Sequence, residues 1–207
     1  MSRVNLYALI HKAQRAHLFD LAFRLGRVSL SDEEELHSIA QGIEEMIVHL
    51  KEHSINEFTF IHPLFTEAGC LIEGIDEEHE ELGQELVKLQ AILSEKNWAE
   101  LYPAFNRFIG SYLLHQDEEE RMQEDVLWNH FSDDRLAEVF VRYQASRSLS
   151  QKIENIKFFL LGLSRDELKN VFLGAQASLP AEAFQQICQT AKEQMEKNRW
   201  AELQSSI

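Results

Sequence analysis

The sequence predicts an all-α protein: an up-down-up-down four-helix bundle with a C-terminal helical extension. Chain breakers are rare, since only 8 of the 207 residues are glycine and 3 are proline. The first two thirds also contain four long segments in which apolar residues recur at alternating spacings of three and four, the period of one helix face. We expect residues 1–135 to form the bundle and residues 136–207 to form an extension that packs on the bundle or on a partner chain.

The first two predicted helices are separated by clear end signals. The first runs from about Asn5 to Leu25, and Gly26 provides a C-terminal stop. A capping box over Ser31–Glu34 opens the second helix. We expect this helix to fade near His62, because the residue before Pro63 avoids the helical region.

The third and fourth predicted helices also have boundary residues. Gly69 and Gly74 mark a loop before the third helix, and Asp76 is expected to cap its N-terminus. The third helix ends near Lys96. Asn97–Glu100 then caps a fourth helix that runs to about His130.

The predicted extension starts with a transition over Ser132–Ser150, and three shorter amphipathic helices follow it. Ser164 and Glu167 form a capping box between the first and second of them. No residue pattern in this extension indicates a chemistry. The three helices are expected over Gln151–Leu163, Arg165–Gln176 and Pro180–Leu203.

Charge and composition exclude several classes of partner. The 35 acidic against 20 basic residues give a formal net charge of -15, which makes a nucleic acid a poor partner. No apolar run approaches the ~20 residues that cross a bilayer, and the N-terminus turns polar too early for a signal peptide. Cys70 and Cys188 are far apart and form no CxxC motif, which favours a reducing compartment. We therefore expect a cytoplasmic protein that binds neither nucleic acid nor membrane.

Polar residues occupy the apolar stripe of all four predicted bundle helices. Short connections make neighbouring helices antiparallel, and each helical residue rises about 1.5 Å, so these polar groups are expected in one layer of the bundle. They are His11 on the first helix, His53 and Glu57 on the second, His79 on the third, and His115 and Glu119 on the fourth.

A layer of this composition indicates a bound cation. Removing a carboxylate from water costs several kcal/mol, and two facing glutamates repel each other. Imidazole nitrogens and carboxylate oxygens are good ligands for iron, manganese or zinc, and carboxylates can bridge two metals. A metal-free, hydrogen-bonded cluster is the alternative. A ferritin-like site needs two Glu-x-x-His pairs, but Asp76 and Tyr112 stand where those glutamates would be.

This pattern resembles the hemerythrin-like (HHE cation-binding) family. The resemblance is carried by the lone His11, by the two His-x3-Glu pairs, and by His79 within IDEEHEEL, and it covers roughly residues 1–135. The flanking stretches IHKAQRAHLFDL, EFTFIHPLF and HQDEEERMQEDVLW are also similar. It implies a four-helix bundle around a non-haem di-iron centre. The implied terminal ligands are His11, His53, His79 and His115, and the implied bridging ligands are Glu57 and Glu119.

The chain also departs from the oxygen-carrying hemerythrins. Those proteins have a second histidine one turn before the one on the third helix, and Ile75 stands there. They end with His-x4-Asp on the fourth helix, where this chain has His-x3-Glu. With fewer histidines the irons should be less saturated, which puts reversible oxygen storage in doubt. The pattern is closer to family members linked to iron handling, to oxygen or nitric oxide sensing, and to the stress response against oxidative or nitrosative damage.

The resemblance implies reduced irons that bind a diatomic ligand, O2 or NO, at an open coordination position. Three functions stay open: a metal-dependent binder or sensor, an enzyme of redox or iron-repair chemistry that handles peroxide, and an interaction module braced by a structural metal. A homodimer through the extension is equally open. His62 is a candidate for lining an access path to the site. The acidic residues around His79, which are Glu77, Glu78, Glu80 and Glu81, are expected to be solvated.

Overall fold

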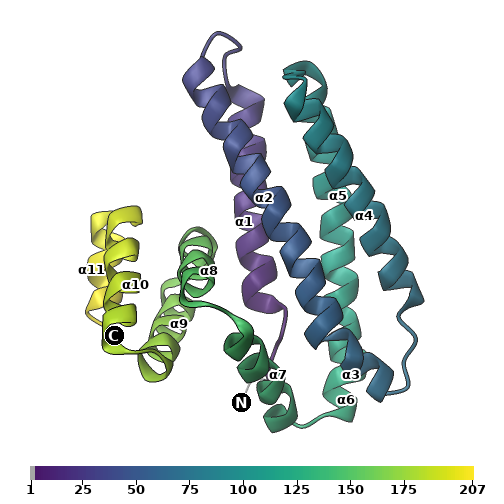
Figure 1. The fold of residues 1–207 in the computed structure, drawn as a ribbon, viewed down its shortest axis with the longest axis vertical. Coiled ribbons are helices and arrows are strands. Elements are labelled where there is room, and N and C mark those ends of the chain that lie inside the picture. The colour runs from purple at the N-terminus through teal and green to yellow at the C-terminus, as the bar shows by residue number, and fades with distance from the viewer. Residues whose placement is uncertain (1–2) are drawn as a thin grey trace. The chain divides into compact units, whose positions relative to one another are not determined.

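A computed structural model describes residues 3–207, and no strand occurs in that range, so the all-α prediction is confirmed (Figure 1). The described residues form two compact units. The long-helix unit comprises residues 3–6 and 17–143, and the C-terminal unit comprises residues 7–16 and 144–207. Within residues 3–207 no helix has both the length and the apolar character that crossing a bilayer requires.

Three long helices form most of the long-helix unit: α2 (Glu33–Phe60), α4 (Glu73–Ser94) and α5 (Trp98–Met122). They lie side by side in Figure 1. Helix α1 (Ala8–Arg27) begins three residues later than predicted and contributes residues 17–27 to this unit. Its Leu21 lies so close to α2 that a Cβ added at Gly42 would come within 2.7 Å of Leu21 Cδ2.

The apolar stripes found in the sequence are the buried faces of these helices. Residues three and four apart on a helix lie on one face, so a stripe with this spacing can be removed from water as a whole. The buried members are Leu36, Ile39, Ile43, Met46 and Leu50 on α2, Leu82, Leu86, Leu89 and Leu93 on α4, and Leu101, Phe105, Phe108 and Tyr112 on α5.

Helix caps lie at two of the predicted helix starts. Before α2 the predicted capping box of Ser31 and Glu34 was wrong by one residue, because it is the side chain of Asp32 that accepts the backbone N–H of Glu35. Before α5, Asn97 does the same for the N–H of Glu100. The turn ahead of Asn97 uses Lys96 in the left-handed region, with φ 52°.

The connection between α2 and α4 differs from the predicted loop. It contains a short helix, α3 (His62–Glu67), with Pro63 in its first turn, where a missing N–H costs nothing. Gly69 supplies a left-handed turn at φ 73°. Helix α4 then begins at Glu73, so Asp76 lies inside its first turn and is not the cap; the predicted cap was wrong because the N–H of Asp76 already bonds to the carbonyl of Ile72.

The last long helix continues beyond Met122, through the π-helical turn η1 (Gln123–Leu127) and α6 (Trp128–His130). Its end at His130 matches the prediction, but the π turn was not predicted. Such turns insert one residue and recur at functional or strained positions. Here it carries the buried Gln123, whose side-chain oxygen accepts the N–H of Leu6 at 2.7 Å.

The predicted transition over Ser132–Ser150 was wrong, because helix α7 (Asp133–Ser146) occupies most of it. Leu136 and Val139 of α7 pack in one cluster with Leu64 and Phe65 of α3. The long-helix unit therefore extends to residue 143, whereas the sequence predicts a boundary at residue 135.

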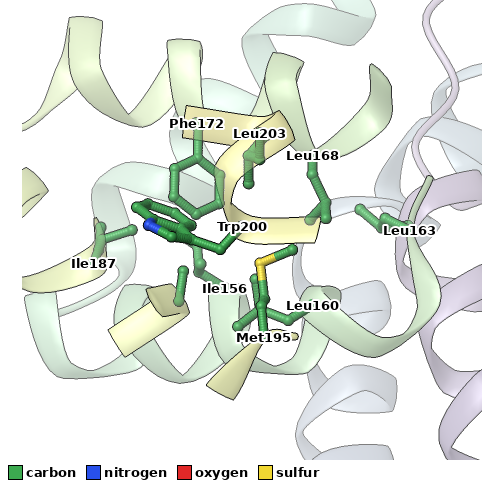
Figure 2. Close-up of a cluster of buried hydrophobic side chains, with 10 residues drawn as sticks. Ile156, Leu160, Leu163, Leu168, Phe172, Ile187, Met195, Trp200 and Leu203 are labelled. Atoms are coloured by element: carbon green, nitrogen blue, oxygen red, sulfur yellow. The ribbon is translucent and has the colours of Figure 1, made fainter. Parts of the chain in front are cut away.

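The C-terminal unit contains α8 (Leu149–Gly162), α9 (Arg165–Ser178), α10 (Ala181–Gln194) and α11 (Lys197–Gln204). The predicted capping box of Ser164 and Glu167 is present at α9. The single helix predicted over Pro180–Leu203 is two helices in the structure. Figure 2 shows the core of this unit, in which the rings of Phe172 and Trp200 lie with their centroids 6.3 Å apart.

Residues 7–16 of α1 belong to the C-terminal unit and are held there by two close contacts. A Cβ added at Gly162 would lie 2.5 Å from Cα of Ala13, so only glycine lets the two backbones approach this closely. Lys12 Nζ lies 2.6 Å from Glu167 Oε2. Burial alone would raise the pKa of Glu167, but hydrogen bonds from Lys12 and Ser164 outweigh it and lower that pKa to about 2.

Candidate metal centre

Five of the six predicted ligands lie in the interior of the long-helix unit. His53 and Glu57 come from α2, His79 from α4, and His115 and Glu119 from α5. Each of these side chains is 10% exposed or less. They lie in the buried stripes of their helices, which is why polar groups from three helices reach one place.

The two carboxylates link the three imidazoles in a chain of short contacts. Oε1 of Glu57 lies 2.8 Å from His53 Nε2, and Oε2 of Glu57 lies 3.3 Å from His79 Nε2. Oε1 of Glu119 lies 3.5 Å from the same nitrogen of His79 and 3.4 Å from His115 Nε2. His79 therefore faces both carboxylates, one from each neighbouring helix.

These groups fall into two sets of the size that binds a cation. His53, Glu57 and Glu119 each offer a ligand atom, and these atoms lie within 4.8 Å of one another. His79, His115 and Glu119 do the same. Glu119 belongs to both sets, which is the arrangement that two cations sharing a carboxylate require.

Protons hold part of this charge when no cation is bound. Burial lowers the pKa of His79, but hydrogen bonds and charge from Glu119 and Glu57 outweigh burial and raise that pKa to about 9. Burial likewise opposes the charge of His115, whose pKa is nonetheless raised, mainly by Glu119. A metal ligand must be deprotonated, so a cation and a proton compete for these nitrogens.

Glu78 on α4 contacts the far side of the His115 ring. Its Oε2 lies 2.8 Å from Nδ1 of His115, while Nε2 of the same ring faces Glu119. Histidines that bind metals almost always donate their other ring N–H to a carboxylate or carbonyl, which fixes the tautomer and the ring orientation. Glu78 is 44% exposed, as expected, but the sequence did not indicate its contact with His115, which is the kind of contact that orients a metal-binding histidine.

The remaining histidines of interest are buried as well. His11 on α1 is fully buried, with its ring centroid 5.0 Å from that of Tyr7. Both belong to the C-terminal unit, so the place of His11 among the ligands stays a prediction. His62 is buried on α3, and its ring stacks on that of His79 with the centroids 5.4 Å apart.

A pocket of about 320 Å³ opens beside the centre, between α2, α4 and α5. It reaches His53, Glu57 and His79. Lys51 and Ser54 contribute the other polar groups, and the rest of the lining is mainly apolar. The remaining lining residues are Leu50, Ile55, Leu82, Gly83, Leu86, Phe108 and Tyr112.

Comparison with protein-family models, with curated proteins and with solved structures gives no match for this chain. The functional argument therefore depends on the chain's own residues and their geometry. The structure supports a buried cluster of histidine and glutamate that could bind a metal.

Proposed function

We propose that this is a hemerythrin-like di-iron protein whose four long helices form an up-down-up-down bundle around two metal ions. The observation that carries the proposal is the burial of Glu57 and Glu119, which are 1% and 2% exposed and contact the same nitrogen of His79. Each buried carboxylate costs several kcal/mol of desolvation. Imidazoliums can offset this charge only while they hold protons, whereas two divalent cations would neutralise both carboxylates.

The two sets of ligands assign the residues to two metal positions. His53 and Glu57 serve the first position, and the predicted ligand His11 joins them there. His79 and His115 serve the second. Glu57 and Glu119 bridge the two, because each lies beside histidines of different helices. Iron would supply binding of O2 or NO and one-electron redox chemistry, and manganese or zinc fits the same donors.

The pocket supports a small, weakly polar ligand at the first position. It reaches His53 and Glu57 of the first position and His79 of the second, but it is not lined by His115 or Glu119. Its mainly apolar lining would keep water from competing with O2 or NO. Peroxide could enter by the same route, so a redox or iron-repair enzyme is the alternative function. A metal that only braced the helices would need no such pocket.

Metal analysis of the full chain, purified without chelators and reconstituted anaerobically with Fe²⁺, tests the proposal. We expect about two irons per chain, as in other carboxylate-bridged di-iron bundles, and a change in the optical spectrum on exposure to air or NO. The double variant Glu57→Ala, Glu119→Ala should lose this iron. Glu81→Ala, which changes an exposed residue of α4, is the matched control. Full iron content in the double variant would refute the ligand assignment.

A further inference from the structure

His62 has an unusual environment for a histidine outside the predicted ligand set. It is 5% exposed and lies on α3, five residues after Glu57. One face of its ring stacks on His79 at an interplanar angle of 12°, and the ring of Phe58 lies 4.6 Å away. Nδ1 lies 3.2 Å from Oδ1 of Asp76, but neither ring nitrogen of His62 has a hydrogen-bond partner.

An unpaired buried imidazole is costly. Leaving a buried donor or acceptor unsatisfied costs free energy. A neutral imidazole has a lone pair on one of its two ring nitrogens. Ring stacking on His79 satisfies neither nitrogen. A cation near Nε2 would do so.

The contact between His62 and Asp76 resembles the contact between His115 and Glu78. Asp76 and Glu78 both lie on α4, and each places a carboxylate oxygen near Nδ1 of a histidine from another helix. A carboxylate at Nδ1 favours the tautomer that leaves the Nε2 lone pair for a metal. In His115 that nitrogen faces Glu119. In His62 that nitrogen has no hydrogen-bond partner, and Nδ1 lies near Oδ1 of Asp76 without forming a hydrogen bond.

The position of His62 also suits a role at the second metal. His62, Asp76 and His79 each offer a ligand atom, and these atoms lie within 4.8 Å of one another. His79 belongs both to this set and to the set with His115 and Glu119. Ile75, one turn before His79, is buried and offers no ligand atom.

We infer that His62 is a ligand of the cation held by His79 and His115, and that Asp76 orients it. The inference rests on the proposed function and adds to it a third histidine at the second metal position. The cation would be a divalent metal that accepts both nitrogen and oxygen ligands, such as Fe²⁺, Mn²⁺ or Zn²⁺. With this position filled, the open coordination position is left to the first metal, where the pocket reaches His53.

Titration of the metal-free full chain with Co²⁺, followed by calorimetry and by visible absorption, tests this inference. His62→Phe keeps a ring beside Phe58 and His79 but removes both nitrogens. We expect it to weaken one of two cobalt sites at least tenfold, since even partners one shell further out contribute about 10–100-fold. The cobalt spectrum should change as well. His37→Phe, at an exposed position of α2, is the control.

The outcomes separate this inference from the proposed function. If the wild-type chain binds two Co²⁺ and His62→Phe binds both with unchanged affinity and spectrum, the role of His62 is overturned and the di-metal centre stands. If the wild-type chain binds none, both fail. If His62→Phe loses its helical circular dichroism in chelator, His62→Gln is judged by the same two readouts.

Discussion

The substitution Glu119→Gln provides the sharpest test of the cation, because its effect should depend on metal. Glutamine keeps the size of the side chain and removes the charge. Glu119 offers a ligand atom to both cation sets, so one substitution weakens both metal positions. Its side chain is only 2% exposed, which means that solvent screens little of the change.

In chelator, Glu119→Gln should be about as stable as the wild type. Without metal, hydrogen bonds and charge from Glu119 and Glu57 raise the pKa of His79 to about 9, and Glu119 also raises the pKa of His115. The substitution removes one of the two buried carboxylates, and Glu57 still faces His79. It removes a buried charge whose desolvation costs several kcal/mol, and it loses charged hydrogen bonds to His79 and His115 worth about 1.5–3 kcal/mol each, so the two contributions nearly cancel.

With metal, the wild type should be the more stable form. A ligand present at a hundredfold excess over its Kd adds about 2.7 kcal/mol per site to the free energy of unfolding. For a chain of this length that corresponds to a rise in Tm of roughly 5–11 °C. Glu119→Gln should lose most of this rise, because neither cation set is complete without Glu119.

Thermal and urea denaturation, followed by circular dichroism with chelator and with Mn²⁺, measures both effects. Asp117→Asn, whose side chain is 72% exposed on the same helix, is the control and should follow the wild type in both conditions. If Glu119→Gln is several kcal/mol less stable in chelator and gains as much from Mn²⁺ as the wild type, the cluster is a metal-free hydrogen-bonded network.

Three further substitutions test the pocket and the C-terminal unit. Gly83→Leu should fill the pocket, since nothing lies within 4 Å of a Cβ at that position. It should slow NO binding by the iron form at unchanged iron content, whereas the control Gly110→Leu on α5 should not. Equal binding rates in the two variants would contradict the access route. Gly162→Ala should lower the free energy of unfolding, measured in urea, by about 1–3 kcal/mol through overpacking. The control Gly174→Ala, which has open space around its Cβ, should raise it by about 0.5–1 kcal/mol. An unchanged stability of Gly162→Ala would contradict the close approach of the two backbones. The pKa of Glu167 is lowered from 4.5 to about 2, so its stabilising effect is full above pH 4.5 and is lost as the pH falls to 2. Glu167→Gln should therefore be less stable than the wild type at pH 7, by about 1 kcal/mol or less for a partly exposed pair. This difference in stability should vanish near pH 2, and a difference that stayed constant with pH would exclude the lowered pKa.

The long helices could be predicted from the sequence because each buries a whole stripe. In α4, four leucines at spacings of three and four specify both the helix and its inward face. The short helix α7 could not be predicted in this way. Its buried residues, Leu136 and Val139, span a single turn, and they are covered by Leu64 and Phe65, more than sixty residues earlier in the chain. Such pairing depends on tertiary context, which periodicity does not contain.

The same distinction applies to the candidate site. Five of the six expected residues meet because a polar side chain in an apolar stripe has to point where the stripe points. Glu78 and His62 could not be found by this argument. Glu78 lies next to His79 in sequence but not in the stripe, and its contact with His115 depends on how α4 is rotated against α5. His62 follows the end of α2, on a short helix that the sequence did not indicate.

Helix α4 therefore explains why the two metal positions should differ in chemistry. Its single ligand, His79, stands between the carboxylates, while Asp76 and Glu78 lie against histidines of α3 and α5. In the proposed centre, the two imidazoles that α4 orients, His62 and His115, would fill coordination positions of the second metal and fix its geometry. The position served by His53 borders the pocket. In the proposed centre an exogenous ligand should thus bind at the first position, which Glu57 and Glu119 would link to the second.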